Sequence, residues 1–304
     1  TGIQFLLMGV LAFLMVRRMT FQRTWQSWVC AIALVSSSFP VIHSVKWGQV
    51  SLLIGVGLIF VFFELREKVY KAAILLGFLG GLKLYPIYFL LIYLLEKRLK
   101  PFFLASGAFV FFAAGFPIFM IGLEATQHYY LRVQGGMVAV KMMASSAGGQ
   151  SLGVSAFRWF QDATHVNTQT PIETALLVDS QALYMLCLLG GSMMLLGLIL
   201  SALRRGFSWE RTAALIILGV HLVVSPGWHH YFAFVPFLWL IAWNVAGKWG
   251  RIILCLVFLL ERLPMFTLGL VDDSYHWYSV SGCTTIVALS IFFVLRFSEK
   301  SATV

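Results

Sequence analysis

Two adjacent histidines, His229 and His230, follow Trp228 in a short polar segment between two apolar runs. An imidazole at such a place can hydrogen-bond a sugar hydroxyl, relay a proton or contact a phosphate. Because neighbouring residues of a helix point about 100° apart, we expect at most one of the two rings to face a site. The alternative is a pair of interfacial histidines beside aromatic residues. No further ligand stands at a helical or loop spacing from the pair, so we predict no metal site.

Lys83 lies inside an apolar run, in the segment Lys83-Leu-Tyr85-Pro86. A charged side chain at membrane depth costs about 2.5–3.5 kcal/mol, and such residues usually face a cavity or a partner. We therefore expect Lys83, with Tyr85 beside it, to bind a phosphate group as a point charge. The alternative is a lysine that reaches the membrane surface or pairs with a carboxylate.

Amides and carboxylates add hydrogen-bonding and proton-accepting groups. Gln49 and Gln150 each follow a glycine, and an amide with two donors and an acceptor suits sugar hydroxyls or phosphate oxygens. Asp272 and Asp273 are the best-placed outer carboxylates for a general base. The alternative for both acids is a solvated place in a loop.

Two further features indicate structure rather than chemistry. Glu261 and Arg262 lie within one apolar run, and we expect them to pair with each other or with a neighbouring helix, unless the run ends before them. The segment Gly77-Phe-Leu-Gly-Gly81 lies in another apolar run and indicates helix packing by small residues, not a nucleotide site.

The composition requires an apolar solvent around these residues. Hydrophobic residues are 60% of the 304 and charged residues 11%, whereas a soluble domain has about 45–50% apolar and about 25% charged residues. A backbone that spans a bilayer must form helices or a closed barrel. Barrel strands alternate apolar and polar residues, and the apolar runs here do not. We therefore predict an all-α polytopic integral membrane protein, with residues 1–304 in a single transmembrane domain.

The net charge of +10 suggests nucleic acid at first sight, but the basic residues stand at the ends of apolar runs and form no patch with interleaved aromatic residues. Such clusters mark the cytoplasmic side of a membrane protein and attract anionic lipid, so we expect no nucleic-acid partner. The four cysteines lie in apolar stretches without a CxxC spacing. They indicate neither a disulfide frame nor a zinc site.

The apolar runs predict about nine or ten membrane segments. The basic clusters between them place the longest polar stretch, residues 124–179, on the other side as a large extracytoplasmic loop. The runs cover roughly residues 3–16, 27–44, 50–64, 72–95, 101–122, 180–203, 212–225, 231–246, 252–270 and 281–297.

Residues 72–95 have a basic cluster at each end, so the segment must enter the membrane and return if both ends are cytoplasmic. Two arms of about 12 residues would each reach roughly 18 Å, too short to cross a core of about 30 Å. We therefore predict a re-entrant hairpin that turns at Lys83–Pro86, where Pro86 lacks an N–H group. The alternative is a single span with one atypical flank.

Three segments together resemble a known family. They are Trp47-Gly-Gln-Val-Ser-Leu-Leu53 followed by Gly80-Gly-Leu-Lys-Leu-Tyr-Pro86, then Gly149-Gln-Ser-Leu152, and last Ser225-Pro-Gly-Trp-His-His-Tyr231. Their order and spacing, over roughly residues 25–245, are similar to those of the polyprenol-phosphate-mannose-dependent glycosyltransferases of the GT-C class, family 87, once called DUF2029. The family pattern commonly has Asn where this chain has Ser51.

The resemblance implies a GT-C-like helical bundle with its site on the extracytoplasmic face of a bacterial inner (plasma) membrane. The donor would be a polyprenyl-phosphate-linked sugar, mannose or another hexose or pentose, and the acceptor a glycolipid or glycan hydroxyl. It implies no cofactor and no metal. The residues that carry over are Gln49, Lys83, Gln150, His229 and His230.

The resemblance also implies a general base, an Asp in the family's first outer loop, which would lie upstream of Thr1 together with the first helix. We therefore expect the sequence to be truncated at its N-terminus. Otherwise, the base falls to Asp272, Asp273 or another outer acid. Two other functions stay open: a transporter or flippase for lipid-linked sugars, and a non-catalytic membrane protein of glycan assembly. Transporters usually show repeats and midplane polar residues, whereas the polar residues here gather in the outer loops.

Overall fold

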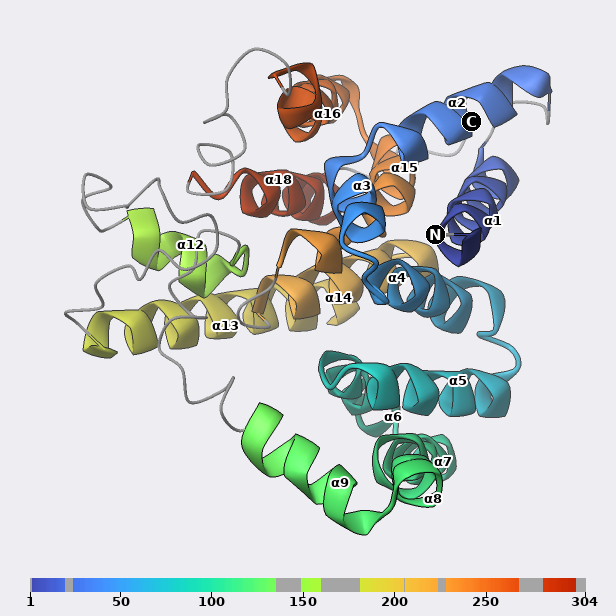
Figure 1. The fold of residues 1–304 in the computed structure, drawn as a ribbon. Helices are drawn as coiled ribbons and strands as arrows, with labels where there is room; N and C mark the ends of the chain where they lie inside the picture. The colour runs from blue at the N-terminus through green and yellow to red at the C-terminus, as the bar shows by residue number, and fades with distance from the viewer. Residues whose placement is uncertain are drawn as a thin grey trace. The chain divides into compact units, whose positions relative to one another are not determined.

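The computed structural model describes residues 2–19, 24–134, 149–159, 181–204, 206–223, 228–267 and 281–298. These residues form helices joined by turns (Figure 1), and none of them belongs to a β-strand. The predicted all-α fold is confirmed for this part of the chain. The chain divides into two compact units, one made of Thr1–Leu52 with Ala144–Val304 and the other of Leu53–Met143. The single transmembrane domain and the outer loop 124–179 stay predictions.

The first unit is built around α14 (Trp209–Val223), whose side chains are buried along most of the helix. A helix that is apolar on all sides belongs in the interior of a bundle. It packs against α13 (Gln181–Arg204), α15 (Val235–Val245) and α18 (Cys283–Phe297). The other helices of this unit are α1 (Gly2–Arg18), α2 (Trp25–Ser36), α3 (Phe39–Lys46), α12 (Leu152–Trp159) and α16 (Lys248–Thr267).

The apolar run 27–44 forms two helices, α2 and α3, that meet at a bend of 62°. The sequence places Pro40 at the start of α3. A proline has no N–H to donate to the carbonyl four residues earlier, and its ring clashes with that carbonyl. The chain therefore leaves the helix at Ser37 and restarts after Ser38, whose backbone is extended with ψ of 121°.

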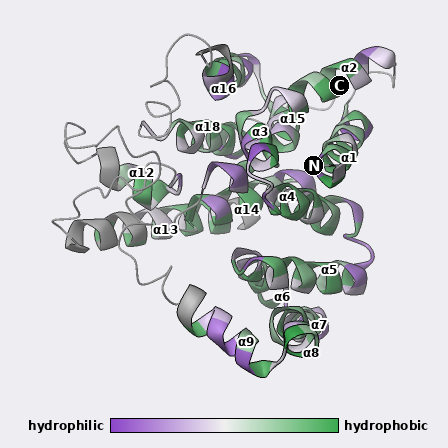
Figure 2. Ribbon diagram, viewed as in Figure 1, coloured by the Kyte–Doolittle hydropathy of each residue, from purple (hydrophilic) through white to green (hydrophobic). Residues whose placement is uncertain are grey.

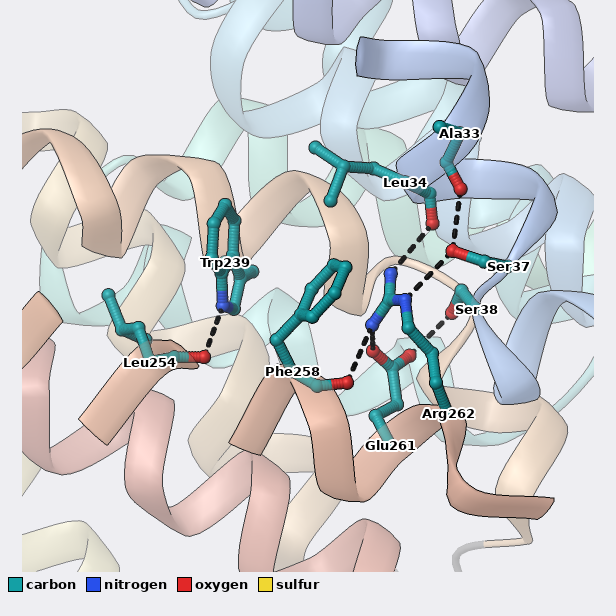
Figure 3. A network of polar contacts seen from close by, with 9 residues as sticks. All are labelled: Ala33, Leu34, Ser37, Ser38, Trp239, Leu254, Phe258, Glu261 and Arg262. Carbon is teal, nitrogen blue, oxygen red and sulfur yellow. Dashed lines mark hydrogen bonds and ion pairs between the residues drawn. The ribbon is translucent and has the colours of Figure 1, made fainter. Parts of the chain in front are cut away.

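A buried ion pair from α16 holds this bend (Figure 3). The Arg262 Nη1 donates to Glu261 Oε2 at 2.6 Å, and each residue is only 3% exposed. Arg262 Nε donates to Ser37 Oγ at 2.8 Å and its Nη2 to the Leu34 carbonyl at 3.1 Å, while Ser38 Oγ donates to Glu261 Oε1 at 2.6 Å. The prediction that Glu261 and Arg262 pair with each other or with a neighbouring helix is confirmed. We call these contacts the α16 clamp.

The second unit packs α5 (Val69–Leu82) closely against α7 (Leu99–Val110) and the π-helical segment η3 (Phe111–Gly115) that continues it. A Cβ added at Gly77 would lie 2.5 Å from the Ala105 carbonyl oxygen, and one at Gly81 would lie 2.6 Å from the Phe112 Cβ. Helix packing by the small residues of this segment is therefore confirmed. The remaining elements are η1 (Phe60–Glu64), η2 (Tyr85–Phe89), α6 (Leu90–Leu95), α8 (Phe116–Ile121), α9 (Leu123–His128) and η4 (Tyr129–Gln134), while α4 (Ser51–Ile59) begins in the first unit and continues into the second.

Alanine at Gly77 should lower the free energy of unfolding by about 1–3 kcal/mol, because its Cβ would collide with backbone atoms of α7. Gly107 lies on α7 with no atom within 4 Å of an added Cβ. Gly107→Ala should therefore leave the stability unchanged or raise it slightly. Thermal unfolding of the two purified variants in detergent checks the prediction, and equal melting temperatures would contradict it.

The described residues contain one helix that is long and apolar enough to cross a bilayer, the continuous stretch Leu99–Ile121. The bent pair of α2 and α3 would make a second. Large apolar side chains stand exposed along Leu99–Ile121, among them Phe103 and Phe119, as a lipid-facing helix requires. Figure 2 shows hydrophobic colours along most helices and hydrophilic ones at the turn between α4 and α5 and on α9. The count of nine or ten membrane segments stays a prediction.

The predicted break at Lys83–Pro86 is confirmed. Helix α5 ends at Leu82, Lys83 is extended with φ of −148° and ψ of 142°, and the short turn η2 begins at Tyr85. The 14 residues of α5 reach roughly 21 Å, less than a membrane core of about 30 Å. The re-entrant path through a membrane stays a prediction that this length favours.

Candidate functional site

Helix α3 presents a row of aromatic rings to the turn η6 (His229–Phe232). Phe39, His43 and Trp47 recur every four residues, a spacing that places them on one side of a helix. The ring centroids of Phe39 and His43 lie 5.6 Å apart, and those of His43 and Trp47 lie 6.2 Å apart. We call this row the α3 ring ladder, and its first two rings contact the histidine pair of η6.

The imidazole of His230 is held by stacking. Its ring lies parallel to that of His43, with 5.5 Å between centroids and 5° between planes. Trp228 stacks on it as well, at 6.1 Å and 27°. Stacking uses the faces of a ring and fixes its plane, while the two nitrogens stay at its edge. His230 is 6% exposed and its Nδ1 is buried, so Nε2 is the ring nitrogen that could face a ligand.

The neighbouring His229 is fully buried. Its Nδ1 lies 2.7 Å from the Thr284 Oγ1, and its ring meets Phe39 edge-on at 5.2 Å and His43 at 5.6 Å. Both imidazoles of the pair therefore contact His43. The expectation that at most one of the two rings faces a site stays a prediction; in this 3-10 turn, His229 is fully buried and His230 is 6% exposed.

Gln150 joins the same part of the unit through its backbone. Gly149 forms an antiparallel bridge with Trp228, and the Gln150 carbonyl accepts a hydrogen bond of 2.8 Å from Thr285 Oγ1. The Gln150 side chain is fully buried. Two adjacent residues at the start of α18 therefore make these hydrogen bonds: Thr284 with His229, and Thr285 with Gln150.

The turn Trp47-Gly-Gln49 directly follows α3. Gly48 has φ of 60°, a conformation that favours glycine, and it turns the chain back so that the Gln49 N–H donates to the Ser44 carbonyl at 2.9 Å. The Gln49 carbonyl accepts a hydrogen bond of 2.8 Å from Gln4 Nε2 of α1. The Gln49 side chain is partly exposed beside Trp47, which is half exposed.

The remaining predicted site residues lie elsewhere. Lys83, half-buried, and Tyr85, buried, belong to the unit Leu53–Met143, and their part in a common site stays a prediction. Asp272 and Asp273 lie outside the described residues. In the part of the chain that the structure describes, no group of three or more His, Cys, Asp or Glu side chains is placed to hold a metal ion.

Sequence reasoning missed His43, Thr284 and Thr285. His43 lies four residues before Trp47 and four after Phe39, so ring spacing along one helix face was a usable signal. The two threonines carried no such signal, because their contacts reach residues 55 and 135 positions away in the chain.

The sequence profile of glycosyltransferase family 87 matches residues 1–226. The matched stretch contains α3, Lys83 and the segment around Gln150, and it ends just before Trp228 and η6. No curated protein and no solved structure matches the chain. The histidine pair is therefore supported by its contacts with α3 and α18 and not by the matched stretch.

Proposed function

Since the chain belongs to glycosyltransferase family 87, we propose that it is a membrane enzyme that transfers a sugar from a polyprenyl-phosphate carrier to a glycolipid or glycan hydroxyl. Family membership implies glycosyl transfer. The proposal adds the lipid-linked donor, with mannose or another hexose or pentose as the sugar. It also adds a site on the extracytoplasmic face, in a bacterial inner membrane.

The observation that carries the proposal is the meeting of three distant segments around His230. The ladder of α3, the Gly149–Gln150 segment and the start of α18 all contact η6 or the residue before it. Trp228 and Gln49 are partly exposed in this unit, and we propose that they bind the donor. We propose separately that Lys83 and Tyr85, of the unit Leu53–Met143, bind the donor phosphate. Gln150 is fully buried and would act by fixing its segment on Thr285, so that the neighbouring Gly149 pairs with Trp228.

The proposed reaction breaks the bond between the anomeric carbon and the phosphate oxygen, and the phosphate keeps the electron pair. The acceptor hydroxyl forms the new bond and gives its proton to a base. By analogy with inverting hydrolysis, one carboxylate on the face opposite the leaving group suffices, and we propose Asp272 or Asp273. The edge of His230 would donate a hydrogen bond to the leaving phosphate as its charge grows. His229, fully buried, would act as a positioning residue.

The test uses purified protein in proteoliposomes with a glycolipid acceptor. Labelled hexoses and pentoses are supplied either on polyprenyl phosphate or on a nucleotide. We expect label on the acceptor only from a lipid-linked donor. Transfer from the nucleotide sugars alone would overturn the proposed donor. Movement of the lipid-linked sugar across the bilayer without transfer would instead identify a flippase.

Replacing Lys83 by alanine should raise KM for the lipid-linked donor by about 10- to 100-fold, the range for losing one hydrogen bond to a charged group. Lys83→Arg keeps the charge and should recover part of the affinity. Lys71 lies exposed on α5 of the same unit, and Lys71→Ala is the matched control that should leave KM unchanged. Initial rates over a range of donor concentrations give the comparison. An equal KM for all variants would remove Lys83 from the donor site.

A further inference from the structure

His43 is a buried histidine of α3 whose ring contacts the histidine pair of η6. It is 7% exposed, about as buried as His230 at 6%, and it contacts both histidines of η6. Its plane lies within 5° of that of His230, the more exposed of the two. A contact of this kind orients the partner ring without requiring a ligand on His43 itself.

Two rings of α3 each contact a different histidine of η6. Phe39 meets His229 edge-on, at an angle of 81°, while His43 meets His230 face-on. His229 has a further anchor in Thr284. The ring of His230 stacks on His43 and on Trp228, and Tyr231 meets it edge-on at 5.1 Å. The two stacks lie along its faces and so bear on its plane.

Helix α3 is a firm support for such a contact. It starts at the bend that the α16 clamp holds through Ser37 and Ser38, and it ends in the turn tied to α1 through Gln4. Both ends of this short helix are therefore fixed by hydrogen bonds to other helices. The ring of His43, in the middle of α3, is therefore held in a fixed position.

We infer that His43 is a positioning residue for sugar transfer, whose flat face sets the plane of the His230 imidazole. The inference rests on the proposed function. Loss of one aromatic pair lowers the population of the aligned ring by about 3- to 10-fold. The effect should fall on kcat, because the aligned edge of His230 matters most when charge develops on the leaving phosphate.

The experiment compares His43→Leu, which keeps apolar volume but has no flat face, with His43→Phe, which restores the face. We expect Leu to lower kcat by about 3- to 10-fold with KM unchanged, and Phe to recover most of the loss. In a His230→Ala background, His43→Leu should cause no further loss, because residues that act through one another are not additive. His221, a fully buried histidine of α14, gives the matched control: His221→Leu should change thermal stability without this coupling to His230.

The outcomes separate the inference from the proposed function. If the wild-type protein transfers no sugar from any lipid-linked donor, the proposed function fails. If the wild type is active and His43→Leu keeps its kcat, the inference is overturned. It is also overturned if His43→Phe is no better than His43→Leu, or if His43→Leu lowers the rate of His230→Ala by the same factor as in the wild type.

Discussion

Alanine in place of His230 should lower kcat for sugar transfer by about 10²–10³, the loss measured when one preorganised hydrogen-bond donor is removed from a site. The expected loss of kcat is this large because the plane of the His230 ring is fixed: two stacked neighbours orient the ring before the substrate arrives. No reorganisation is then needed as charge develops on the phosphate. Initial rates at saturating lipid-linked donor measure the effect, and His230→Gln, which retains an N–H donor, should recover part of it.

The matched control is His128→Ala, at an exposed histidine of α9. It should transfer sugar at the wild-type rate. The melting temperature of each variant shows whether a lost rate reflects lost folding. A folded His230→Ala protein with wild-type kcat would remove this residue from the site and leave the cluster as packing.

Alanine in place of Arg262 should destabilise the protein by about 3–5 kcal/mol, because it leaves the buried Glu261 carboxylate without its cation. The bend between α2 and α3 also loses the hydrogen bonds to Ser37 Oγ and the Leu34 carbonyl. The melting temperature in detergent should fall by roughly 10 °C. Because α3 begins at this bend, the transfer rate of the folded fraction should fall as well.

Two companion variants sharpen this prediction. Arg251 lies exposed on the same helix α16, and Arg251→Ala should change the stability by less than about 0.5 kcal/mol. Replacing the pair together, with Glu261→Gln and Arg262→Met, removes both charges and should be more stable than Arg262→Ala alone. If Arg262→Ala has the same melting temperature as the wild type, the ion pair does not hold the bend.

Helices and some of their breaks follow from local sequence. The apolar runs without alternation predict helices, and Pro86 marks the break after α5 correctly. The equivalent break before Pro40 was missed although Ser36, Ser37 and Ser38 stand there, because neighbouring groups can satisfy a proline break inside a membrane. What fixes that break lies on α16, 225 residues away, where no local pattern can show it.

For the candidate site too, the sequence indicated the residue types but not the contacts between them. The residue types of Trp228, His230 and Gln150 indicated binding and proton chemistry, and the structure brings their segments together. The ring of His230 stacks on His43, which lies in an apolar run and was not singled out from the sequence. Contacts between such distant segments arise from helix packing, which residue spacing in one segment does not encode.

The separation in sequence between the α2–α3 bend and the α16 clamp sets the order in which they form during synthesis. Helices α2 and α3 have 12 and 8 residues, roughly 18 Å and 12 Å long, so neither alone can cross a membrane core of about 30 Å. Arg262 follows Ser37 by 225 residues, which a ribosome needs roughly 10–45 s to add. Until then the Leu34 carbonyl, to which Arg262 later donates, must be satisfied by water or lipid headgroups. The N-terminal part of the first unit is therefore finished late, from the C-terminal side, and a nascent chain released before residue 262 leaves it incomplete.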